Sequence, residues 1–459
     1  MTGNVLYDGH NLSLQQSTGI GTYARTLAAT AAGIGFQPEL LIGGNAGIDR
    51  RDPQFSEIAL FDAVIAEQPS LKLRLGREAA RYIGKPFGIR SAEFSRAGAV
   101  VSGPSSLDGF RKLHVAPDVF ELGRLHFRRY GTRAEIRLES PASLAHFTFP
   151  TPLKARGSAN VYTIHDIVPL RLPQTTLDDK KYFLKLLRRL CNEADHIVTV
   201  SEFSKQDIVR FVGMDESRIT NTYQSIRLPE SVLEKSDDVV ADEVGKSFGL
   251  DFRGYYIFFG AIEPKKNISR LIDAYAASGS AFPLIIVGAL GWQYEADVEK
   301  LKDERFLYYR RDADRLVPSR RVARIPYLPF SQLMTLVKGA RGVLFPSLYE
   351  GFGLPVLEAM TLGTPVMTSN VASLPEISGG AAALVDPTDV DAITRAIAAF
   401  DHDDGLRQEL ALRGRKRAAF FSSEMYADRL ASLYARLGVS PAPSAAEAMP
   451  VMQLAANPT

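Results

Sequence analysis

The sequence of 459 residues is poor in several features that would each place it in a particular class of protein. Its single cysteine, Cys191, excludes an internal disulfide and a cysteine-based metal site, so we expect a reducing compartment. Its 54 Lys and Arg are balanced by 52 Asp and Glu, and the net charge of +2 gives no bulk electrostatic case for nucleic acid as a partner. No run approaches the ~18 uninterrupted apolar residues of a membrane span, and the N-terminus lacks the basic start and apolar core of a signal peptide. We therefore expect a soluble, cytoplasmic protein, and peripheral contact with a membrane stays open.

The remaining composition is that of an ordinary globular protein, with 46% apolar and 23% charged residues. At about 150 residues per domain, the length allows two or three domains, each with its own core. Strand-like runs at 144–148, 160–164 and 196–200 alternate with helix-like spacing, most clearly at 177–193. Such alternation predicts an α/β fold with parallel sheets, in which ligands bind at the carboxyl ends of the strands.

One stretch, residues 343–360, carries the strongest functional signal. Val343 to Phe345 is a short apolar run typical of a buried strand, a turn bracketed by Gly351 and Gly353 follows, and helical spacing begins at Pro355. The glycines allow the backbone to approach a ligand closely, and the free N–H groups of a first helical turn attract anionic oxygens. The pattern therefore predicts a phosphate site.

Two carboxylates flank this phosphate site. Glu350 lies in the turn and Glu358 in the second turn of the helix, so they can contact different parts of one bound molecule. Carboxylates accept paired hydrogen bonds from neighbouring hydroxyls, as sugars offer. The pattern indicates a nucleotide-sugar pocket, and the alternative is an ordinary strand-turn-helix unit with solvated glutamates.

The stretch resembles the paired-glutamate motif (Glu, seven residues, Glu) of retaining GT-B-fold glycosyltransferases of family 4, also called group 1. Residues 362–366, 373–377 and 384–387 continue the resemblance, and Gly291 followed by Trp292 is similar to the mannosyltransferase-B-like subgroup. The resemblance to the family covers residues 1 to about 60 and about 140 to 438. This resemblance implies the GT-B fold, with two Rossmann-like domains whose parallel sheets face a central cleft, and metal-independent transfer with retention.

The resemblance also implies the roles of individual residues. His165 would reach the donor sugar from a strand end, Lys266 would bind the diphosphate, and the family usually has an arginine where this chain has Lys265. Glu358 would hold the ribose and Glu350 the donor sugar. As catalytic residues we predict His165, Glu350 and Lys266, and as donor-binding residues Gly19, Gly21, Asp166, Lys265, Gly351, Phe352, Gly353, Leu354 and Glu358.

The glycines Gly19 and Gly21 also fit a dinucleotide-binding fingerprint formally. That fingerprint needs its glycines directly after a strand. Here about ten residues separate the glycines from the strand predicted at 4–8. The Asp-x-Asp at 312–314 is similar to the metal motif of other glycosyltransferases, but it lies between arginines in what we expect to be a charged loop. We therefore predict no metal site.

The expected domain organisation follows from the linker-like composition of residues 228–249, which are polar and charged. We predict an N-terminal acceptor domain at 1–235 with an insertion at about 65–130, and a nucleotide-sugar-binding domain at 236–420. A helix at 421–438 would return to the N-terminal domain, and 439–459 would be a disordered tail.

Within the insertion, residues 71–90 mix apolar and basic positions. The pattern fits docking on an anionic membrane surface as well as it fits a solvated helix face. A second basic cluster, residues 124–129, is more typical of a helix surface.

Together these features predict a retaining hexosyltransferase that moves mannose, from GDP-mannose, to a glycan or lipid-linked acceptor in bacterial-type polysaccharide biosynthesis (O-antigen, capsule or exopolysaccharide). Mannose and the guanine base rest on the subgroup resemblance alone. The alternatives are a GT-B phosphorylase or epimerase, or a nucleotide-sugar-binding regulator without turnover.

Overall fold

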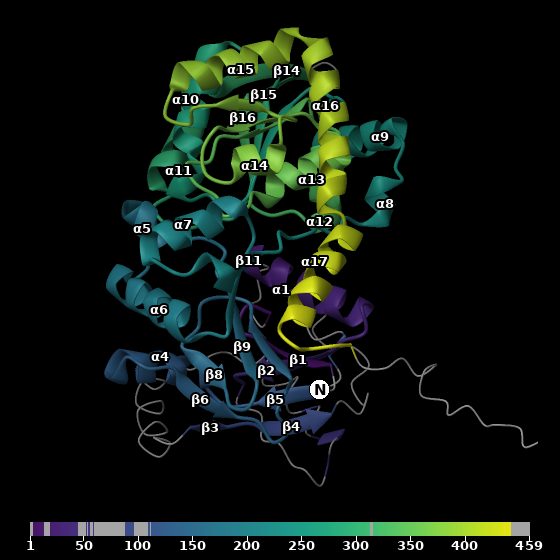
Figure 1. Ribbon diagram of the computed structural model, residues 1–459. Coiled ribbons are helices and arrows are strands. Elements are labelled where there is room, and N and C mark those ends of the chain that lie inside the picture. The colour runs from purple at the N-terminus through teal and green to yellow at the C-terminus, as the bar shows by residue number, and fades with distance from the viewer. Residues whose placement is uncertain are drawn as a thin grey trace, which may run out of the picture. The chain divides into compact units, whose positions relative to one another are not determined.

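The computed structural model describes residues 3–12, 19–44, 88–95, 109–110, 112–312 and 315–441, together with the isolated positions 52, 54, 55 and 58. Their contacts divide the chain into two compact units (Figure 1). The first unit comprises Met1–Thr163, Lys185–Val198 and Tyr426–Thr459, and the second comprises Ile164–Leu184 and Thr199–Met425. The domain boundaries predicted after residues 235 and 420 stay a prediction. The two compact units are defined by contacts and divide the chain at other positions.

An eight-stranded sheet forms the first large layer, in the order β11-β10-β9-β7-β1-β2-β5-β4. The register from β10 to β5 is parallel, and only the edge strand β4 pairs in the antiparallel sense, with β5. The bounds are β1 (Asn4–Asp8), β2 (Gln37–Ile42), β4 (Ala92–Ser95), β5 (Lys112–Val115), β7 (Leu144–Phe147), β9 (Ala159–Thr163), β10 (His196–Thr199) and β11 (Ile219–Asn221). The strands predicted at 4–8, 144–148, 160–164 and 196–200 are thus confirmed to within a residue.

The centre of this sheet is buried on both faces, as expected for parallel strands. Val5, Leu6 and Tyr7 of β1 are at most 1% exposed. The Tyr7 hydroxyl lies 3.0 Å from the hydroxyl of Tyr434, which comes from helix α17 (Ser423–Arg436). The end of the chain therefore contributes to the core of the first unit. Helix α1 (Gly19–Gly33) belongs to the same unit.

A small parallel sheet, in the order β3-β6-β8, belongs to the same unit and includes part of the predicted insertion. Its strands are β3 (Ile89–Arg90), β6 (Ala134–Arg137) and β8 (Leu153–Ala155), and helix α4 (Val119–Tyr130) packs on β6. A Cβ at Gly123 of α4 would lie 2.5 Å from Leu153 Cδ2, so the helix and the sheet approach closely. Residues 59–87 lie outside the described part of the chain.

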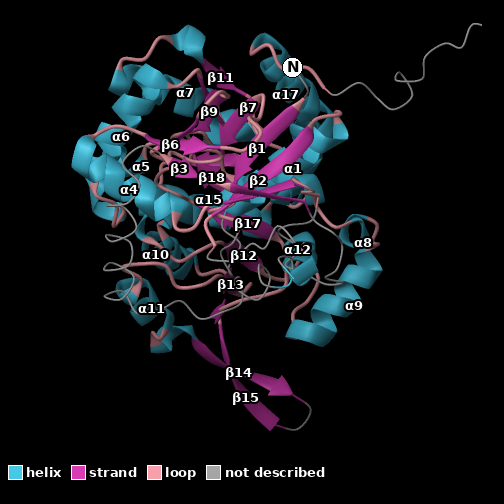
Figure 2. Cartoon of the chain, turned by 90° about the horizontal axis from the view of Figure 1, so that it is seen from below, coloured by secondary structure: helices cyan, strands magenta, loops and turns pink. Residues whose placement is uncertain are grey.

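The second unit is built on a six-stranded sheet, in the order β16-β13-β12-β17-β18-β19, with every pair parallel (Figure 2). Its strands are β12 (Tyr256–Phe259), β13 (Leu284–Val287), β16 (Val322–Ile325), β17 (Gly342–Phe345), β18 (Val366–Ser369) and β19 (Ala383–Val385). The helices that alternate with them are α10 (Ile268–Ser278), α11 (Glu295–Leu301), α12 (Phe330–Lys338), α13 (Leu354–Leu362), α14 (Leu374–Ser378), α15 (Val390–His402) and α16 (Asp404–Ala418). Strand and helix alternate as in a Rossmann-like domain.

Other helices lie between β9 and β12 along the chain, the first three of them between strands of the first sheet. They are α5 (Val168–Arg171), α6 (Lys180–Glu193), α7 (Glu202–Val212), α8 (Glu230–Leu233) and α9 (Asp237–Phe248). Most of the predicted linker at 228–249 is helical, and its role as a linker stays a prediction. Its polar residues form a helix surface: the Ser236 side chain caps α9 by accepting from the Val239 N–H, and Val240 and Val244, four residues apart, are buried.

The charged stretch around Asp312 forms an antiparallel hairpin of β14 (Leu307–Asp312) and β15 (Arg315–Arg320), which projects from its neighbours in Figure 2. The charged loop expected around residues 312–314 is thus limited to the turn between β14 and β15. Residues 313 and 314 of this turn lie outside the described part of the chain. The expected tail is likewise outside it from residue 442 on.

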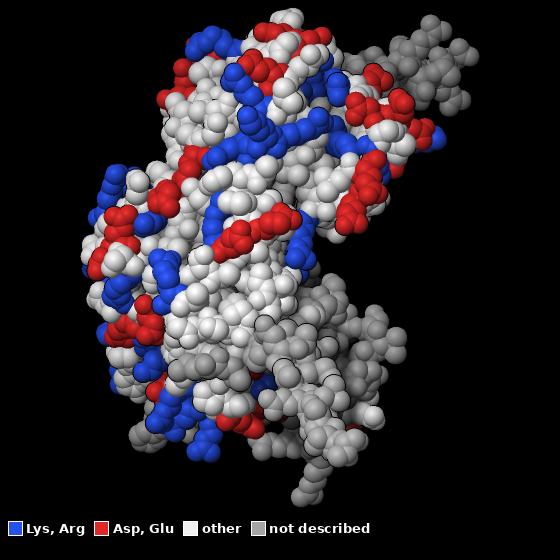
Figure 3. Space-filling view, turned by 45° about the vertical axis from the view of Figure 1, so that its right-hand side comes forward, with Lys and Arg blue, Asp and Glu red and all other residues white. Residues whose placement is uncertain are grey.

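The surface carries both signs of charge, with Lys and Arg gathered in places and acidic side chains between them (Figure 3). Among the described helices, none is at once long enough and apolar enough to cross a membrane. The described residues also contain no cluster of three or more His, Cys, Asp or Glu arranged to hold a metal ion.

Candidate functional site

The predicted strand-turn-helix is present in the second unit. Strand β17 ends at Phe345, and α13 begins at Leu354 with a proline in its first turn. Gly353 has a φ of 102°, a left-handed conformation that side chains disfavour, which explains the glycine at this position. The turn between them carries Glu350, and α13 carries Glu358.

Gly351 is needed for a reason that the sequence did not indicate. A Cβ at this position would lie 2.4 Å from the backbone oxygen of His165 and 3.0 Å from the Cβ of Asp166. The Gly351 carbonyl accepts hydrogen bonds from the hydroxyls of Ser201 (2.7 Å) and Ser204 (3.2 Å). The glycine thus lets the turn pack against residues 165–166, which brings the predicted His165 and Asp166 to the same site as Glu350.

We expect Gly351→Ala to destabilise the second unit by about 1–3 kcal/mol, because the new methyl group meets backbone that cannot move aside. Gly245→Ala is the matched control. Gly245 lies in α9, and the nearest atom to an added Cβ is 4.0 Å away, so this change should stabilise by about 0.5–1 kcal/mol. Urea unfolding of the two variants measures both effects, and equal stabilities would contradict the packing role of Gly351.

His165 and Asp166 follow the end of β9 by two and three residues, as predicted for the carboxyl end of a strand. The His165 carbonyl accepts a hydrogen bond of 2.8 Å from the Ser204 hydroxyl. Asp166 accepts a hydrogen bond of 3.1 Å from the Val168 N–H, at the start of α5. Both residues are half-buried, and both are held through local hydrogen bonds.

Glu350 forms the centre of a buried charge cluster. Lys266 Nζ and the Ser347 hydroxyl each donate to Glu350 Oε1 at 2.6 Å. Burial alone would raise the pKa of Glu350, but the charges of Lys266 and Lys265 outweigh it and hold the pKa below its usual value. Glu350 is therefore ionised at neutral pH, with one oxygen already committed to two donors.

Lys265 and Lys266 follow β12, at the carboxyl end of a central strand. Lys265 Nζ lies 3.5 Å from Glu263 Oε1. Burial would lower the pKa of Lys265, but the negative charges of Glu350, Asp166 and Glu263 raise it overall, so the side chain keeps its charge. The site thus holds two ammonium groups, and Lys266 also lies 5.0 Å from the ring centre of Phe345.

Glu358 is about as buried as Glu350, but it differs in its partners and in its pKa. It is 9% exposed, and none of the described residues donates a hydrogen bond to its carboxylate. Burial raises its pKa to about 7. A largely buried carboxyl group without a protein donor loses most of its hydration, and a ligand that donates to it would replace what is lost.

The structure also shows residues that hold the turn and that the sequence did not single out. The Ser373 hydroxyl donates to the carbonyls of Glu350 and Phe352, both at 2.9 Å. The Tyr349 hydroxyl donates to Asp207 Oδ2 at 2.5 Å. These contacts fix the backbone on both sides of Glu350. Ser373 lies in a segment that carried the family resemblance, and that was the only signal for it.

A further contact joins α7 to α14. The carboxylate of Glu376 accepts hydrogen bonds from the backbone N–H groups of Glu202 (2.8 Å) and Phe203 (3.0 Å). These are first-turn N–H groups of α7, where a carboxylate is favoured, and Ser201 caps the same end.

The remaining predicted donor-binding residues have varied places. Phe352 is buried and packs edge-on against Phe421, with ring centres 5.5 Å apart, and Leu354 is the first residue of α13. Gly19 and Gly21 lie in the first turn of α1, in the other unit. Their role towards the donor stays a prediction, and so do the roles of the other site residues.

Solved structures with this architecture are GT-B glycosyltransferases. HepE from Anabaena, in complex with UDP and glucose, aligns with a TM-score of 0.61 and 14% identity over 94% of this chain and 99% of that one. Sucrose-phosphate synthase from Thermosynechococcus elongatus aligns with a TM-score of 0.59 and 17% identity over 95% and 99%. At these identities the likeness establishes the fold, and the predicted fold class is confirmed.

Sequence comparison supplies the family. The family described as Glycosyl transferases group 1 matches residues 248–417, and Glycosyltransferase Family 4 matches residues 96–226. O-antigen chain mannosyltransferase B from Escherichia coli is 35% identical over 275 residues, which are 58% of this chain and 67% of that protein. The chain belongs to the group 1, family 4 glycosyltransferases, as the resemblance implied.

A second relative, the serotype-specific mannosyltransferase WbdA from Escherichia coli, is 29% identical over 273 residues. The match spans 57% of this chain but only 31% of that longer protein. The two relatives share the name mannosyltransferase.

Proposed function

We propose that this chain transfers mannose from a nucleoside-diphosphate sugar, GDP-mannose, to a glycan or lipid-linked acceptor, with retention, in polysaccharide biosynthesis. The mannosyltransferases among its relatives support the sugar and the pathway. The observation that carries the donor site is Glu358, a buried carboxyl group without a protein donor, on the helix that follows the Glu350 turn. Ribose hydroxyls are the donors that this carboxyl group lacks.

In the proposed mechanism, the diphosphate lies between the first turn of α13 and the ammonium of Lys266. The bond from the anomeric carbon to the diphosphate oxygen breaks, the acceptor oxygen bonds to that carbon, and its proton passes to the departing diphosphate oxygen. Negative charge grows on the leaving diphosphate, and a positioned ammonium in a buried site stabilises that charge most strongly in the transition state. Because the leaving group is already good, no side chain has to act as a strong base.

The other residues position the sugar. Glu350 is held by Lys266 and Ser347 on one oxygen, which leaves its second oxygen for sugar hydroxyls. His165 follows β9 in the segment that packs against Gly351, and the family resemblance assigns its ring to the same sugar. Lys265 adds a second positive charge. We expect these two lysines to supply the charge that a metal ion provides in other transferases, and turnover to survive a chelator.

A donor panel tests the proposal. The protein is incubated with GDP-mannose, UDP-glucose and UDP-galactose without acceptor, and free sugar is measured. We expect slow release of mannose from GDP-mannose, unchanged by EDTA, and faster consumption when a mannose-terminated oligosaccharide is added. Binding of a nucleotide sugar without any turnover would favour the regulator, and release of sugar 1-phosphate with inorganic phosphate would favour a phosphorylase.

The proposal extends to location. We infer a cytoplasmic protein at the inner face of the plasma membrane, with the basic and apolar residues 71–90 in contact with anionic lipid. That segment lies outside the described residues except for 88–90. Its contact with the membrane therefore rests on its composition. Co-sedimentation with anionic vesicles, of the wild type and of the variant K72Q/R74Q/R77Q/R81Q, tests this contact.

A further inference from the structure

Trp292 is the only tryptophan of the chain, and it joins two segments that are far apart in sequence. Its indole Nε1–H donates a hydrogen bond of 2.7 Å to the carbonyl oxygen of Thr175, 117 residues earlier. Trp292 lies in the loop after β13, and Thr175 ends the short turn that follows α5. Both residues belong to the second compact unit. Because an indole can donate only one hydrogen bond, this contact uses the whole polar capacity of the side chain.

The loop that carries Trp292 is held tightly against the segment that leads to the two lysines. The Gly291 N–H donates to the Ile262 carbonyl at 2.9 Å, and the Ile262 N–H donates to the Ala289 carbonyl, also at 2.9 Å. A Cβ at Gly291 would lie 2.9 Å from that Ile262 oxygen, so the close approach requires glycine. Ile262 precedes Lys266 by four residues. The backbone that supports Lys266 therefore also supports Trp292.

Thr175 is connected by successive hydrogen bonds to the residues beside His165. The Thr175 N–H and hydroxyl both donate to the Leu172 carbonyl, at 2.9 and 2.8 Å. The Leu172 N–H donates to the Val168 carbonyl at 2.8 Å, and the Val168 N–H donates to Asp166 at 3.1 Å. These bonds make the segment a single hydrogen-bonded piece of chain, so a contact that fixes Thr175 restrains His165 as well.

The hydrogen bond of Trp292 closes a circuit of contacts around the candidate site. Lys266 Nζ lies 2.6 Å from Glu350 Oε1, and the turn that carries Glu350 packs through Gly351 against the backbone of His165. The segment of His165 then returns through Trp292 to the loop that supports Lys266. We call this closed path the contact circuit. Each of the three predicted catalytic residues lies on it.

We propose that Trp292 is a positioning residue, which clasps the segment of His165 to the segment of Lys266 through its N–H. The role in transfer rests on the proposed function, whereas the clasp itself does not. Misplacement of a group by about 1 Å can slow a reaction by about 10²-fold, so the supports that fix such groups affect the rate strongly. The nucleotide contacts expected for Glu358 and the first turn of α13 do not include the clasp. Trp292 should therefore govern the rate of transfer and not the affinity for the nucleotide.

Two substitutions separate the hydrogen bond of Trp292 from the packing of its side chain. Trp292→His keeps a donor in the same place, because Nε2 of an imidazole and Nε1 of an indole occupy equivalent positions in their five-membered rings. At pH 8 the imidazole is neutral, and one of its tautomers carries the proton on Nε2. Trp292→Phe keeps a six-membered apolar ring and removes the donor. A clasp predicts that the histidine variant retains what the phenylalanine variant loses, and a packing role predicts the reverse.

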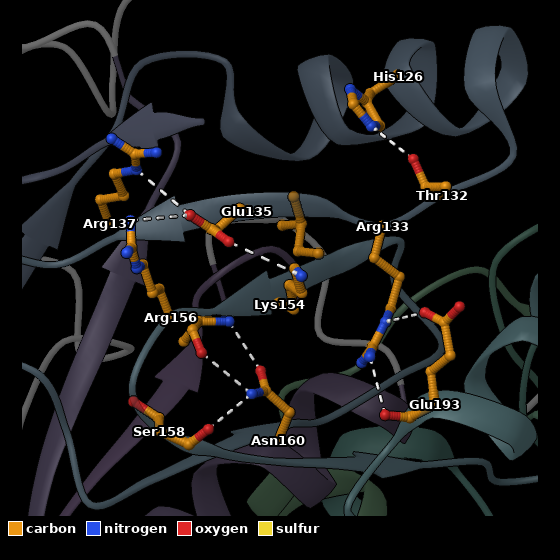
Figure 4. Close-up of polar contacts among 12 residues, drawn as sticks. His126, Thr132, Arg133, Glu135, Arg137, Lys154, Arg156, Ser158, Asn160 and Glu193 are labelled. Carbon is orange, nitrogen blue, oxygen red and sulfur yellow. Dashed lines mark hydrogen bonds and ion pairs between the residues drawn. The ribbon is translucent and has the colours of Figure 1, made fainter. Parts of the chain in front are cut away.

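Two further substitutions are matched controls, because each also introduces phenylalanine in place of a hydrogen-bonding side chain. Tyr275→Phe removes the hydroxyl that donates to the Phe282 carbonyl at 2.8 Å, at the amino end of β13 in the same unit. His126→Phe removes the ring nitrogen that lies 2.9 Å from the Thr132 hydroxyl in the first unit (Figure 4). None of these residues belongs to the contact circuit, so neither variant should alter the rate of transfer.

Hydrogen exchange of the full chain, followed by mass spectrometry without any donor, measures the clasp itself. In Trp292→Phe we expect the backbone amides of residues 168–175 to exchange about threefold faster or more, since a hydrogen bond that opposes local opening is lost. Trp292→His and both controls should exchange at these amides like the wild type. The inference is overturned if Trp292→Phe leaves this exchange unchanged, or if Trp292→His raises it as much.

Single-turnover transfer with saturating GDP-mannose measures the consequence for catalysis, and urea unfolding shows that each variant is folded. We expect Trp292→Phe to lower the rate by about 10- to 100-fold and Trp292→His to stay closer to the wild type, with the Kd for GDP within about twofold throughout. An unchanged rate in Trp292→Phe, or a Kd that changes as much as the rate, overturns the positioning role. If the wild type transfers sugar from no nucleotide sugar, the proposed function fails, and the exchange experiment still decides whether the clasp exists.

Discussion

Lys266→Ala is expected to lower the rate of sugar transfer by about 10²–10³-fold, the typical cost of removing one group that stabilises transition-state charge. Lys266 is buried beside Glu350, with 2.6 Å between Nζ and Oε1, so its charge acts in surroundings that screen it weakly. Its removal withdraws the positive charge from the leaving diphosphate. It also leaves Glu350 with one close cation fewer. Single-turnover kinetics with saturating donor measure the effect on the chemical step.

Lys265→Ala is the control for this prediction. Lys265 is the adjacent residue, it carries the same charge, and its close partner is Glu263 at 3.5 Å and not Glu350. We expect a smaller loss of rate from this variant. Small and equal losses from both variants would mean that the lysines are a structural pair and that the diphosphate is bound elsewhere.

Glu358→Gln is expected to weaken binding of the nucleoside diphosphate at pH 8 by about 1.5–3 kcal/mol, roughly 10- to 150-fold, because hydrogen bonds to a charged acceptor are the strong ones. The carboxyl group has a pKa of about 7 in the free protein. Ribose hydroxyls donate to the ionised form, so the affinity of the wild type should rise between pH 6 and pH 8. Calorimetry should use a nucleotide sugar, because it lacks the terminal phosphate whose ionisation would also depend on pH. An equally steep rise of affinity with pH in the Gln variant would contradict the ribose role.

The same substitution should have the opposite effect on stability. Burial raises the pKa of Glu358 from 4.5 to about 7, so the folded state holds this proton more tightly than the unfolded state. The stability that this provides is complete below pH 4.5 and is lost as the pH rises through 7, by about 3 kcal/mol in all. Glu358→Gln should therefore gain stability over the wild type at pH 8 and little at pH 5. Urea unfolding at the two pH values measures this, and a difference independent of pH would sink the burial argument.

The sequence predicted the strand-turn-helix of residues 343–360 well because its signals are local. The change from strand to helical spacing, the glycine in a left-handed conformation at 353 and the proline after it all act within a few residues. The family resemblance then distinguished Glu350 and Glu358 from ordinary surface glutamates. Neither signal shows that Glu350 is ionised while Glu358 titrates near pH 7, because that contrast comes from Lys266, which is 84 residues away from Glu350 in the chain.

The features that the sequence did not reveal have equally physical causes. The helix α9 within residues 228–249 was not predicted because most of it faces solvent, and only Val240 and Val244 mark its buried side. The packing of Gly351 against His165 joins segments that are far apart in sequence, which no local pattern reveals.

The central claim is that one pocket of the second unit binds the donor through Glu358, Lys266 and the first turn of α13. A crystal structure of the protein with GDP bound tests it most directly. We expect the ribose hydroxyls within about 2.6–3.2 Å of the Glu358 carboxylate, and the diphosphate in contact with Lys266 Nζ and the backbone N–H groups that follow Gly353. A nucleotide bound elsewhere, with the Glu358 carboxylate still without a donor, would contradict the account.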